Sequence, residues 1–259
     1  MTGDARLAPQ GLSQSPSNSP LDLDPPSHGT LYGVGVGPGA PDLLTLRAAR
    51  LIADARVVAY PTLAGGESFA RAIAAEMIPE GCVEVAIDVP MTIERGPAQK
   101  AYDQGAVILS EHLARGVNVV CLCEGDPFFY GSFMYLFARL SSEYKCEVVP
   151  GVTSVTACAA RARMPLAARN ERLTILPGPL PAPELRARIE GAESVAIMKV
   201  GRHLTKIRDV IAELGLLGAA TYVERATLDD ERVLPLSDAP TDAPYFSMIL
   251  ITKGADPWL

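Results

Sequence analysis

Short β-branched runs alternate with longer stretches in which Leu and Ala recur at helical spacing, from residue 30 to the end of the chain. The β-branched runs of the first half predict strands at residues 30–36, 56–60, 82–90, 117–123 and 146–151. The stretches between them predict helices at residues 42–53, 67–78, 97–116, 132–140 and 152–163, and we expect Asp42 to cap the first helix. Because residues 117–123 are almost wholly apolar, that strand is expected to be buried on both faces.

The alternation restarts after a connector at residues 164–171. Strands are predicted at residues 172–178, 194–201, 219–227 and 244–254, with helices at 182–191 and 204–215. This order predicts an α/β protein of two α/β domains, at residues 30–168 and 169–259. Residues 1–29, rich in Ser, Pro and Asp, are expected to form a disordered leader.

Charge and cysteine usage limit the classes of partner. The chain has 23 Lys and Arg against 30 Asp and Glu, a net charge of −7, so nothing favours nucleic acid or an anionic membrane as a partner. A polyanionic ligand would need locally clustered arginines. The five cysteines form no Cys-x-x-Cys pair and the three histidines have no metal-ligand spacing, which indicates a cytoplasmic protein without a metal site. No apolar stretch approaches the roughly 20 residues that cross a bilayer.

A glycine-rich turn, GVGVGPGA, follows the first predicted strand. Gly35, Gly37 and Ala40 match the pattern of a dinucleotide-binding loop, which makes an NAD-dependent oxidoreductase one alternative. That fold requires an acidic residue at the end of the second strand, where this chain has Ala-Tyr-Pro at 59–61. Pro38 also removes a backbone N–H that a pyrophosphate could use. The glycines are therefore better explained by a tight turn, in which the absence of side chains lets the backbone approach a neighbouring group closely.

Two further loops follow predicted strands. CEGDPFFYG places Asp126 at the end of the buried strand, and VVPGVTS places Thr153 and Ser154 at the start of a helix. Taken singly, each loop is also explained by ordinary turn chemistry, core aromatics and helix capping. Three such loops at successive strand ends favour a ligand site, because α/β folds bind ligands at the carboxyl ends of their strands.

Together the motifs resemble the tetrapyrrole (corrin/porphyrin) methylase family, whose members use S-adenosylmethionine (SAM). The resemblance is carried by YGVGVGPGAPDLL, GDPFFYG, VVPGVTS, MKVGRHL and YVERAT, and it covers residues 30–254. It implies two α/β domains with SAM in the cleft between them, and a homodimer. The residues that it places around SAM are Pro38, Glu124, Gly125, Asp126, Phe129, Thr153, Ser154, Met198 and Ala226.

Within the family, ACAARARMPLA, IMKVGRHL and PYFSMILI most resemble the branch that methylates C20 of precorrin-2 in cobalamin biosynthesis. Uroporphyrinogen methylases have Gly-Gly-Asp-Pro where this chain has Glu124-Gly-Asp-Pro, and Gly in place of Ala226. Cobalt-factor II or a uroporphyrinogen-III type substrate remains the alternative. The candidate catalytic residues are Tyr130 and Glu124, beside the Gly-Asp-Pro loop, with core packing as the alternative for Tyr130. The expected substrate-binding residues are Arg47, Arg202 and His203, as the cationic groups near the motifs that could meet carboxylate arms.

Overall fold

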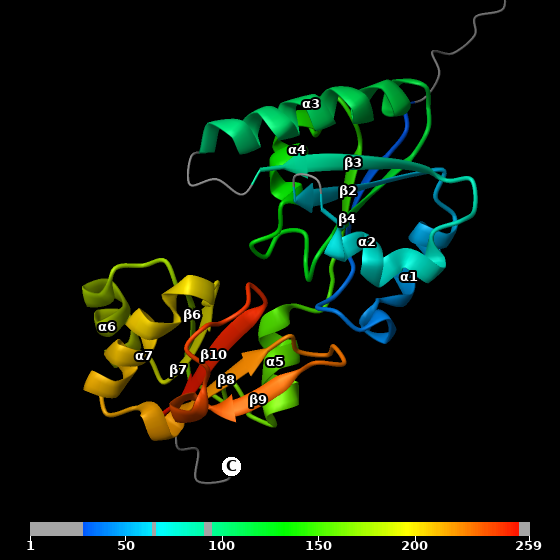
Figure 1. The fold of residues 1–259 in the computed structure, drawn as a ribbon. Helices are drawn as coiled ribbons and strands as arrows, with labels where there is room; N and C mark the ends of the chain where they lie inside the picture. Colours follow the sequence, from blue (N-terminus) through cyan, green and yellow to red (C-terminus); the bar gives the residue numbers. More distant parts are fainter. Residues whose placement is uncertain (1–27, 64–65, 91–94, 254–259) are drawn as a thin grey trace, which may run out of the picture.

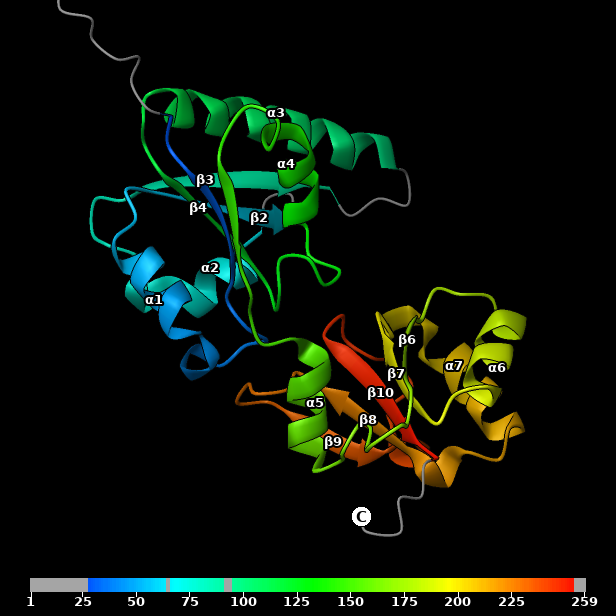
Figure 2. The same cartoon turned by 180° about the vertical axis from the view of Figure 1, so that it is seen from behind.

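The computed structural model describes residues 28–63, 66–90 and 95–253, so most of the predicted leader lies outside the described residues. The described chain forms two α/β units, each built on a five-stranded sheet (Figure 1; Figure 2). The α/β fold class predicted from the sequence is confirmed.

The first unit is a three-layer arrangement around a parallel sheet of order β3-β2-β4-β1-β5. Its strands are β1 (Leu31–Gly35), β2 (Val57–Leu63), β3 (Val83–Val89), β4 (Val119–Cys123) and β5 (Cys146–Val149). Its helices are α1 (Leu46–Ala53), α2 (Phe69–Ala74), α3 (Arg95–Ala114) and α4 (Phe133–Leu140). Helices α3 and α4 cover one face of the sheet, and α1 and α2 cover the other. Every residue of β4 is buried, as the apolar run predicts.

The second unit has a mixed sheet of order β6-β7-β10-β8-β9, in which only β6 and β7 are parallel. Its strands are β6 (Leu173–Pro177), β7 (Ser194–Met198), β8 (Ala220–Glu224), β9 (Arg232–Pro235) and β10 (Ser247–Thr252). Helices α6 (Ala182–Glu190) and α7 (Leu204–Glu213) pack on one face, and α5 (Ser154–Ala162) packs on the other. Short 3₁₀ helices lie at Pro41–Leu43, Ala75–Met77, Gly201–His203, Leu217–Ala219 and Leu236–Asp238.

Helix α5 belongs to the second hydrophobic core. Val155, Cys158 and Ala159 on this helix pack with residues of β7, β8 and β10. The chain therefore passes from the first core to the second between β5 and α5, earlier than the expected boundary at residues 168 and 169. The sequence could not show this, because the apolar face of a helix does not specify which of two sheets it packs against.

Local differences from the predicted elements have identifiable causes. Thr45, rather than Asp42, caps α1 by accepting a hydrogen bond from the Ala48 N–H at 3.1 Å. Strand β2 continues beyond Pro61 to residue 63, because β2 pairs with β3 along its whole length. Strand β9 was not predicted, since it has four residues and no buried side chain. Strand β8 ends at residue 224 because Arg225 takes a positive φ of 49°.

The order of strands places a ligand crevice beside β1 and β4. These two neighbouring strands lead to helices on opposite faces, α1 after β1 and α4 after β4. At such a reversal the loops diverge and leave a crevice at the carboxyl ends of the strands. The second unit lies across this edge, so loops of both units can contribute to one site (Figure 1).

Candidate functional site

The ends of β1, β4 and β5 approach so closely that glycine is required there. Gly37 and Gly125 form an isolated bridge, with N···O distances of 2.7 and 3.3 Å between their backbones. A Cβ on Gly151 would lie 2.0 Å from the Gly125 carbonyl oxygen, and one on Gly35 would lie 2.6 Å from the same oxygen. These contacts explain the glycine pattern of the first loop as strand-end packing, which is the interpretation that the sequence favours over a dinucleotide site.

The first loop also contacts the second unit. The Ala40 N–H donates to the Thr227 hydroxyl at 3.0 Å, and a Cβ on Gly39 would lie 2.8 to 2.9 Å from Leu228 and Thr227. Thr227 itself has a positive φ of 72°, and its N–H donates to Glu231 at 2.6 Å. The loop after β8 is thus fixed against the loop after β1, and the two units meet at this point.

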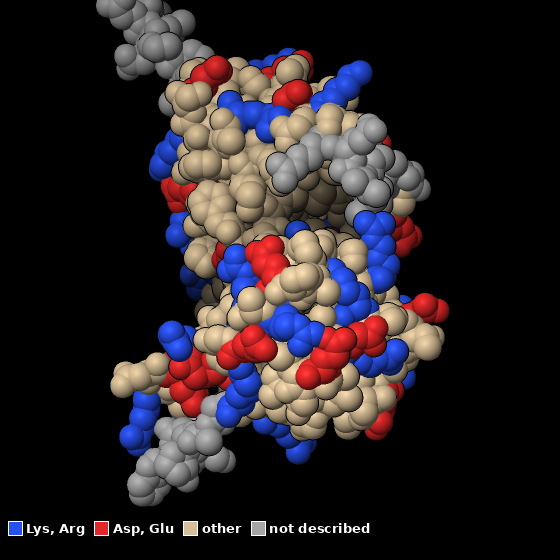
Figure 3. Space-filling view, turned by 90° about the vertical axis from the view of Figure 1, so that its left-hand side faces the viewer, with Lys and Arg blue, Asp and Glu red and all other residues tan. Residues whose placement is uncertain are grey.

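A cavity lies between the units, with about 900 Å³ free of protein atoms when the part open to solvent is included. The space-filling view shows the surface hollowed between the two units, with Lys and Arg side chains along the lower margin (Figure 3). The lining includes every residue that the resemblance places around SAM: Pro38, Glu124, Gly125, Asp126, Phe129, Thr153, Ser154, Met198 and Ala226. Their binding roles stay predictions, but the structure brings them together.

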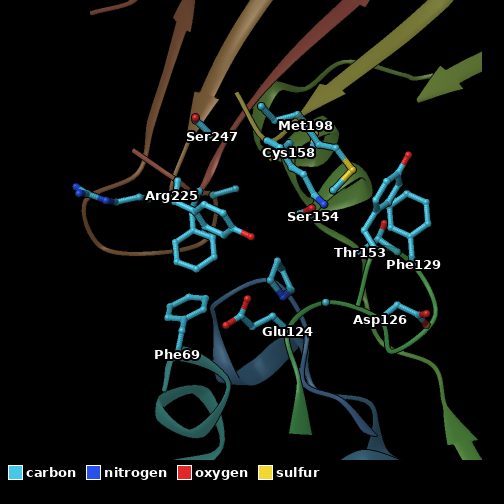
Figure 4. Close-up of a pocket in the computed structure, with 18 of the residues that line it drawn as sticks. Phe69, Glu124, Asp126, Phe129, Thr153, Ser154, Cys158, Met198, Arg225 and Ser247 are labelled. Atoms are coloured by element: carbon cyan, nitrogen blue, oxygen red, sulfur yellow. The ribbon is translucent and has the colours of Figure 1, made fainter. Parts of the chain in front are cut away.

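Glu124 supplies a carboxylate that has no partner among the described residues. Its side chain points into the cavity (Figure 4), and within the described residues it takes part in no hydrogen bond or ion pair. Burial raises the pKa of Glu124 above its ordinary value, since the charged form has lost much of its water. Burial, and after it the negative charge of Glu124, raises the pKa of Tyr245, another residue of the lining. A half-buried, unpaired carboxylate of this kind suits a cationic ligand or a proton acceptor.

Asp126, by contrast, points away from the centre of the cavity (Figure 4). One carboxylate oxygen accepts from the Phe128 N–H at 2.9 Å, and the other accepts from the Gly151 N–H at 3.1 Å. The side chain therefore ties the loop after β4 to the loop after β5. Its hydrogen-bonding capacity is used by the protein itself, which favours the structural role over the cofactor role.

We expect Asp126→Ala to lower the free energy of unfolding by about 1–3 kcal/mol, because the part-buried Gly151 N–H and the exposed Phe128 N–H lose a charged acceptor. Affinity for a ligand of the cavity falls with it, since both loops line the cavity. Urea denaturation and ligand titration measure the two effects. Unchanged stability with lost ligand binding would show instead that the carboxylate contacts the ligand directly.

Helix α5 begins at the cavity. Thr153 is its N-cap, with the Thr153 hydroxyl 3.4 Å from the Thr156 N–H and 3.1 Å from the Thr156 hydroxyl. Thr153 thus has the capping role that the sequence offered as the alternative to ligand binding. Ser154, in the first turn, lines the same wall. The unpaired N–H groups of a helix start carry partial positive charge, so this end suits a carboxylate.

Aromatic contacts join the two units beside the cavity. Phe69, at the start of α2, lies 4.5 Å from Phe246 between ring centroids, and Phe246 also contacts Tyr245. Across the cavity, the Lys199 ammonium lies 5.2 Å from the ring centroid of Tyr130. Of these residues, Tyr130 alone was named from the sequence. Phe69, Lys199, Tyr245 and Phe246 were not named. The signal for Tyr245 and Phe246 is an aromatic pair directly before an apolar strand, within the PYFSMILI motif.

The expected substrate-binding residues Arg47, Arg202 and His203 do not line the cavity. Arg47 on α1 forms an ion pair of 2.5 Å with Glu147 of β5. Arg202 and His203 lie in the 3₁₀ helix after β7, a few residues beyond the lining. Burial lowers the pKa of His203, and Lys206 and Arg202 lower it further. This imidazole therefore loses its charge at a lower pH than an ordinary histidine and is a weak partner for a carboxylate.

The described residues hold neither a metal-binding cluster nor a membrane-spanning helix. Residues 28–63, 66–90 and 95–253 contain no group of three or more His, Cys, Asp or Glu side chains arranged to hold a metal ion. In the same residues, no helix combines the length and apolar character that crossing a membrane needs.

Comparison with known proteins gives a consistent result. The sequence profile of the tetrapyrrole (corrin/porphyrin) methylases matches residues 30–240. The cobalamin biosynthesis protein CobIJ of Mycobacterium bovis is 41% identical over 88% of this chain, and the chain spans 47% of that relative's length. A precorrin-2 C(20)-methyltransferase from Sinorhizobium is 39% identical, covering 88% of this chain and 97% of the relative. A cobalt-precorrin-2 C(20)-methyltransferase from Salmonella typhimurium is 32% identical, covering 87% and 97%.

Solved structures agree on the fold. A cobalt precorrin-4 methyltransferase superposes with a TM-score of 0.69 at 24% identity, covering 86% of this chain and 94% of the other. A uroporphyrin-III C-methyl transferase from Thermus thermophilus, complexed with S-adenyl homocysteine, has a TM-score of 0.62 at 25% identity, covering 87% and 92%.

Proposed function

The chain belongs to the tetrapyrrole (corrin/porphyrin) methylase family, as its motifs predict, and on this premise we propose that it transfers a methyl group from SAM to C20 of precorrin-2. The product would be precorrin-3A, in cobalamin biosynthesis. The observation that carries the proposal is the cavity between the two units, whose lining holds every residue that the family resemblance assigns to SAM. Similarity to a precorrin-2 C(20)-methyltransferase along nearly the whole length of that relative supports the choice of substrate.

The residues present fit SAM chemically. When bound, SAM supplies an electrophilic methyl group on a positively charged sulfonium. Glu124 offers an unpaired carboxylate that offsets positive charge in a site with reduced solvent screening. The first turn of α5, with Ser154, can hold the carboxylate of an amino-acid end. Met198 and Ala226, on the second unit, provide apolar and polarisable surface for a purine.

Glu124 also fits the proton transfer that the reaction requires. The C20 carbon must lose a proton once its new bond to carbon has formed, and a carboxylate in the cavity can accept it. Methyl transfer would move the positive charge from the donor to the acceptor, and loss of the C20 proton to the carboxylate would then neutralise the acceptor. Tyr130 lines the same cavity and orients the acceptor from the side of the first unit.

Alignment of the two substrates in the cavity would also accelerate methyl transfer. Displacement at a methyl group needs the acceptor carbon in line with the breaking bond at about 3–3.5 Å, and such alignment alone is worth several kcal/mol. Contacts between the units, from Phe69 to Phe246 and from Ala40 to Thr227, hold the two walls of the cavity in a fixed relation. A cavity with fixed walls would keep the acceptor carbon in line with the methyl group.

The proposal also includes a cytoplasmic homodimer that needs no bound metal. The dimer rests on the family resemblance alone. A reducing compartment is supported by the five cysteines, all of which are free. Light scattering on the purified protein would measure the mass of the assembly and decide between monomer and dimer.

Binding calorimetry tests the cofactor. We expect the purified protein to bind SAM and S-adenosylhomocysteine and to release no heat with NAD or ATP. SAM binding is expected because the cavity combines an unpaired carboxylate with the start of a helix. NAD binding is not expected, because β2 does not end in the acidic residue that would bind the ribose of a dinucleotide. Binding of NAD without binding of SAM would overturn the methylase proposal.

A further inference from the structure

Lys199 is a cation of the cavity that has no acidic partner in the part of the chain that the structure describes. It follows β7 directly, and its side chain is exposed. Within the described residues it forms no ion pair, and its ammonium lies over the ring of Tyr130. Arg225, the other basic residue of the lining, is paired with Asp230, and its side chain points away from the cavity (Figure 4). Lys199 is therefore the uncompensated positive charge among the described lining residues.

The contact between Lys199 and Tyr130 joins the two units. Tyr130 comes from the loop between β4 and α4, and its side chain is 44% exposed. A cation over an exposed ring is held only weakly, so the ammonium can leave the ring for a stronger partner. A carboxylate is such a partner, because a charge-assisted hydrogen bond is stronger than a cation–π contact in water. The contact with Tyr130 therefore holds the ammonium of Lys199 only until a stronger partner binds it.

The backbone fixes both residues in unusual conformations. Lys199 and Tyr130 each have a φ of 57°, in the left-handed region that side chains other than glycine rarely adopt. At Lys199 the turn is held by packing, since the Gly178 N–H donates to the Met198 carbonyl at 2.7 Å and a Cβ on Gly178 would lie 2.8 Å from the Lys199 carbonyl oxygen. Conformations of this kind are retained where the surrounding structure enforces them, often at ligand sites.

Building on the proposed methyltransferase function, we propose that Lys199 binds a carboxylate arm of the tetrapyrrole and so determines specificity for a polycarboxylate acceptor. Tyr130 positions the ammonium at the cavity before the substrate arrives. The chain carries a net charge of −7, so a polyanionic acceptor needs a local cation at the cavity. The expected residues Arg47, Arg202 and His203 lie outside the lining, which leaves Lys199 in the place that this role requires.

The test uses three variants and two readouts. Lys199→Met removes the charge, Lys199→Arg keeps it, and Lys100→Met removes an exposed lysine of α3 as the matched control. The first readout is the binding of uroporphyrin, a stable polycarboxylate porphyrin, followed by its fluorescence anisotropy at low and high salt. The second is the KM for precorrin-2, measured beside kcat and the Kd for SAM.

We expect Lys199→Met to weaken uroporphyrin binding and to raise the KM for precorrin-2 by about 10-fold, with the Kd for SAM unchanged. High salt should reduce the difference from wild type, and Lys199→Arg should restore most of the affinity. Lys100→Met should match wild type in both readouts. Equal uroporphyrin binding by Lys199→Met and wild type would overturn the inference.

The two readouts separate this inference from the proposed function. If the wild type binds uroporphyrin through Lys199 but methylates no tetrapyrrole, the proposed function fails and the carboxylate site stands. If methylation proceeds and Lys199→Met changes neither binding nor KM, the function stands and the inference fails. A loss of SAM affinity equal to the loss of tetrapyrrole affinity would show a structural role for Lys199, which also contradicts the inference.

Discussion

The Glu124→Gln variant is expected to lose methyl transfer by roughly 10²- to 10⁴-fold, while its free energy of unfolding at neutral pH rises above that of wild type. Gln has nearly the shape of Glu and keeps the volume of the side chain, but it can neither accept the C20 proton nor offset positive charge. The gain in stability arises because the wild type keeps an unpaired carboxylate half-buried.

The pH dependence of this effect has a definite sign. The folded-state pKa of Glu124 lies above its ordinary value, so the folded protein holds the proton more tightly than the unfolded chain. Wild type therefore loses stability relative to Glu124→Gln as pH rises from the ordinary pKa through the raised one. Methyl transfer by wild type rises over the same interval, since the ionised form is the active one.

Thermal unfolding and initial rates across this pH range measure both parts of the Glu124 prediction. Glu143→Gln, at an exposed position after α4, is the matched control and should leave rate and stability unchanged. A Glu124→Gln variant that retains full activity would exclude a catalytic role. A variant that loses stability as well as activity would make Glu124 a structural residue.

Gly151→Ala is expected to lower the free energy of unfolding by about 3 kcal/mol and to abolish measurable SAM binding. The new Cβ would lie 2.0 Å from the Gly125 carbonyl oxygen and 2.9 Å from the Gly35 backbone. All of these atoms are backbone, so no side-chain rotation can relieve the clash. The ends of β1, β4 and β5 must separate, and the loops that line the cavity move with them.

Gly96→Ala provides the control for this substitution. Gly96 lies in the first turn of α3, and among the described residues a Cβ there would have no neighbour within 4 Å apart from adjacent residues and its own helix. Since Ala favours the helix, this variant should be neutral or slightly more stable, with SAM binding unchanged. Urea denaturation and calorimetry give the comparison. A Gly151→Ala protein with native stability and affinity would show that the three strand ends are not packed as described.

The three loops that line the cavity could be predicted from the sequence because each follows an apolar run and opens with Gly or Pro-Gly chemistry. The structure places them side by side, as the parallel order of β4, β1 and β5 requires. The separate roles of Glu124 and Asp126 could not be predicted. The two residues are two positions apart in one loop, and only the direction of each side chain decides which one binds backbone and which one faces the cavity.

Contributions from the second unit were harder to predict. Lys199 and Phe246 meet residues of the first unit across long separations in sequence, and no local pattern encodes such a contact. Arg47 was expected at the site because it lies in the first motif. Its ion pair with Glu147, 100 residues further along the chain, could not be predicted from that motif. Charge counts identify the need for a cation at the cavity, but tertiary packing decides which cation is free.

Incubation of the purified protein with precorrin-2 and SAM that carries an isotopically labelled methyl group tests the central claim most directly. The account predicts that the tetrapyrrole gains the mass of one methyl group in place of a hydrogen, and that nuclear magnetic resonance finds the label on C20. A parallel incubation with cobalt-precorrin-2 shows whether the metal-free acceptor is preferred. Label at another carbon, or a protein that binds SAM and methylates neither tetrapyrrole, would contradict the account.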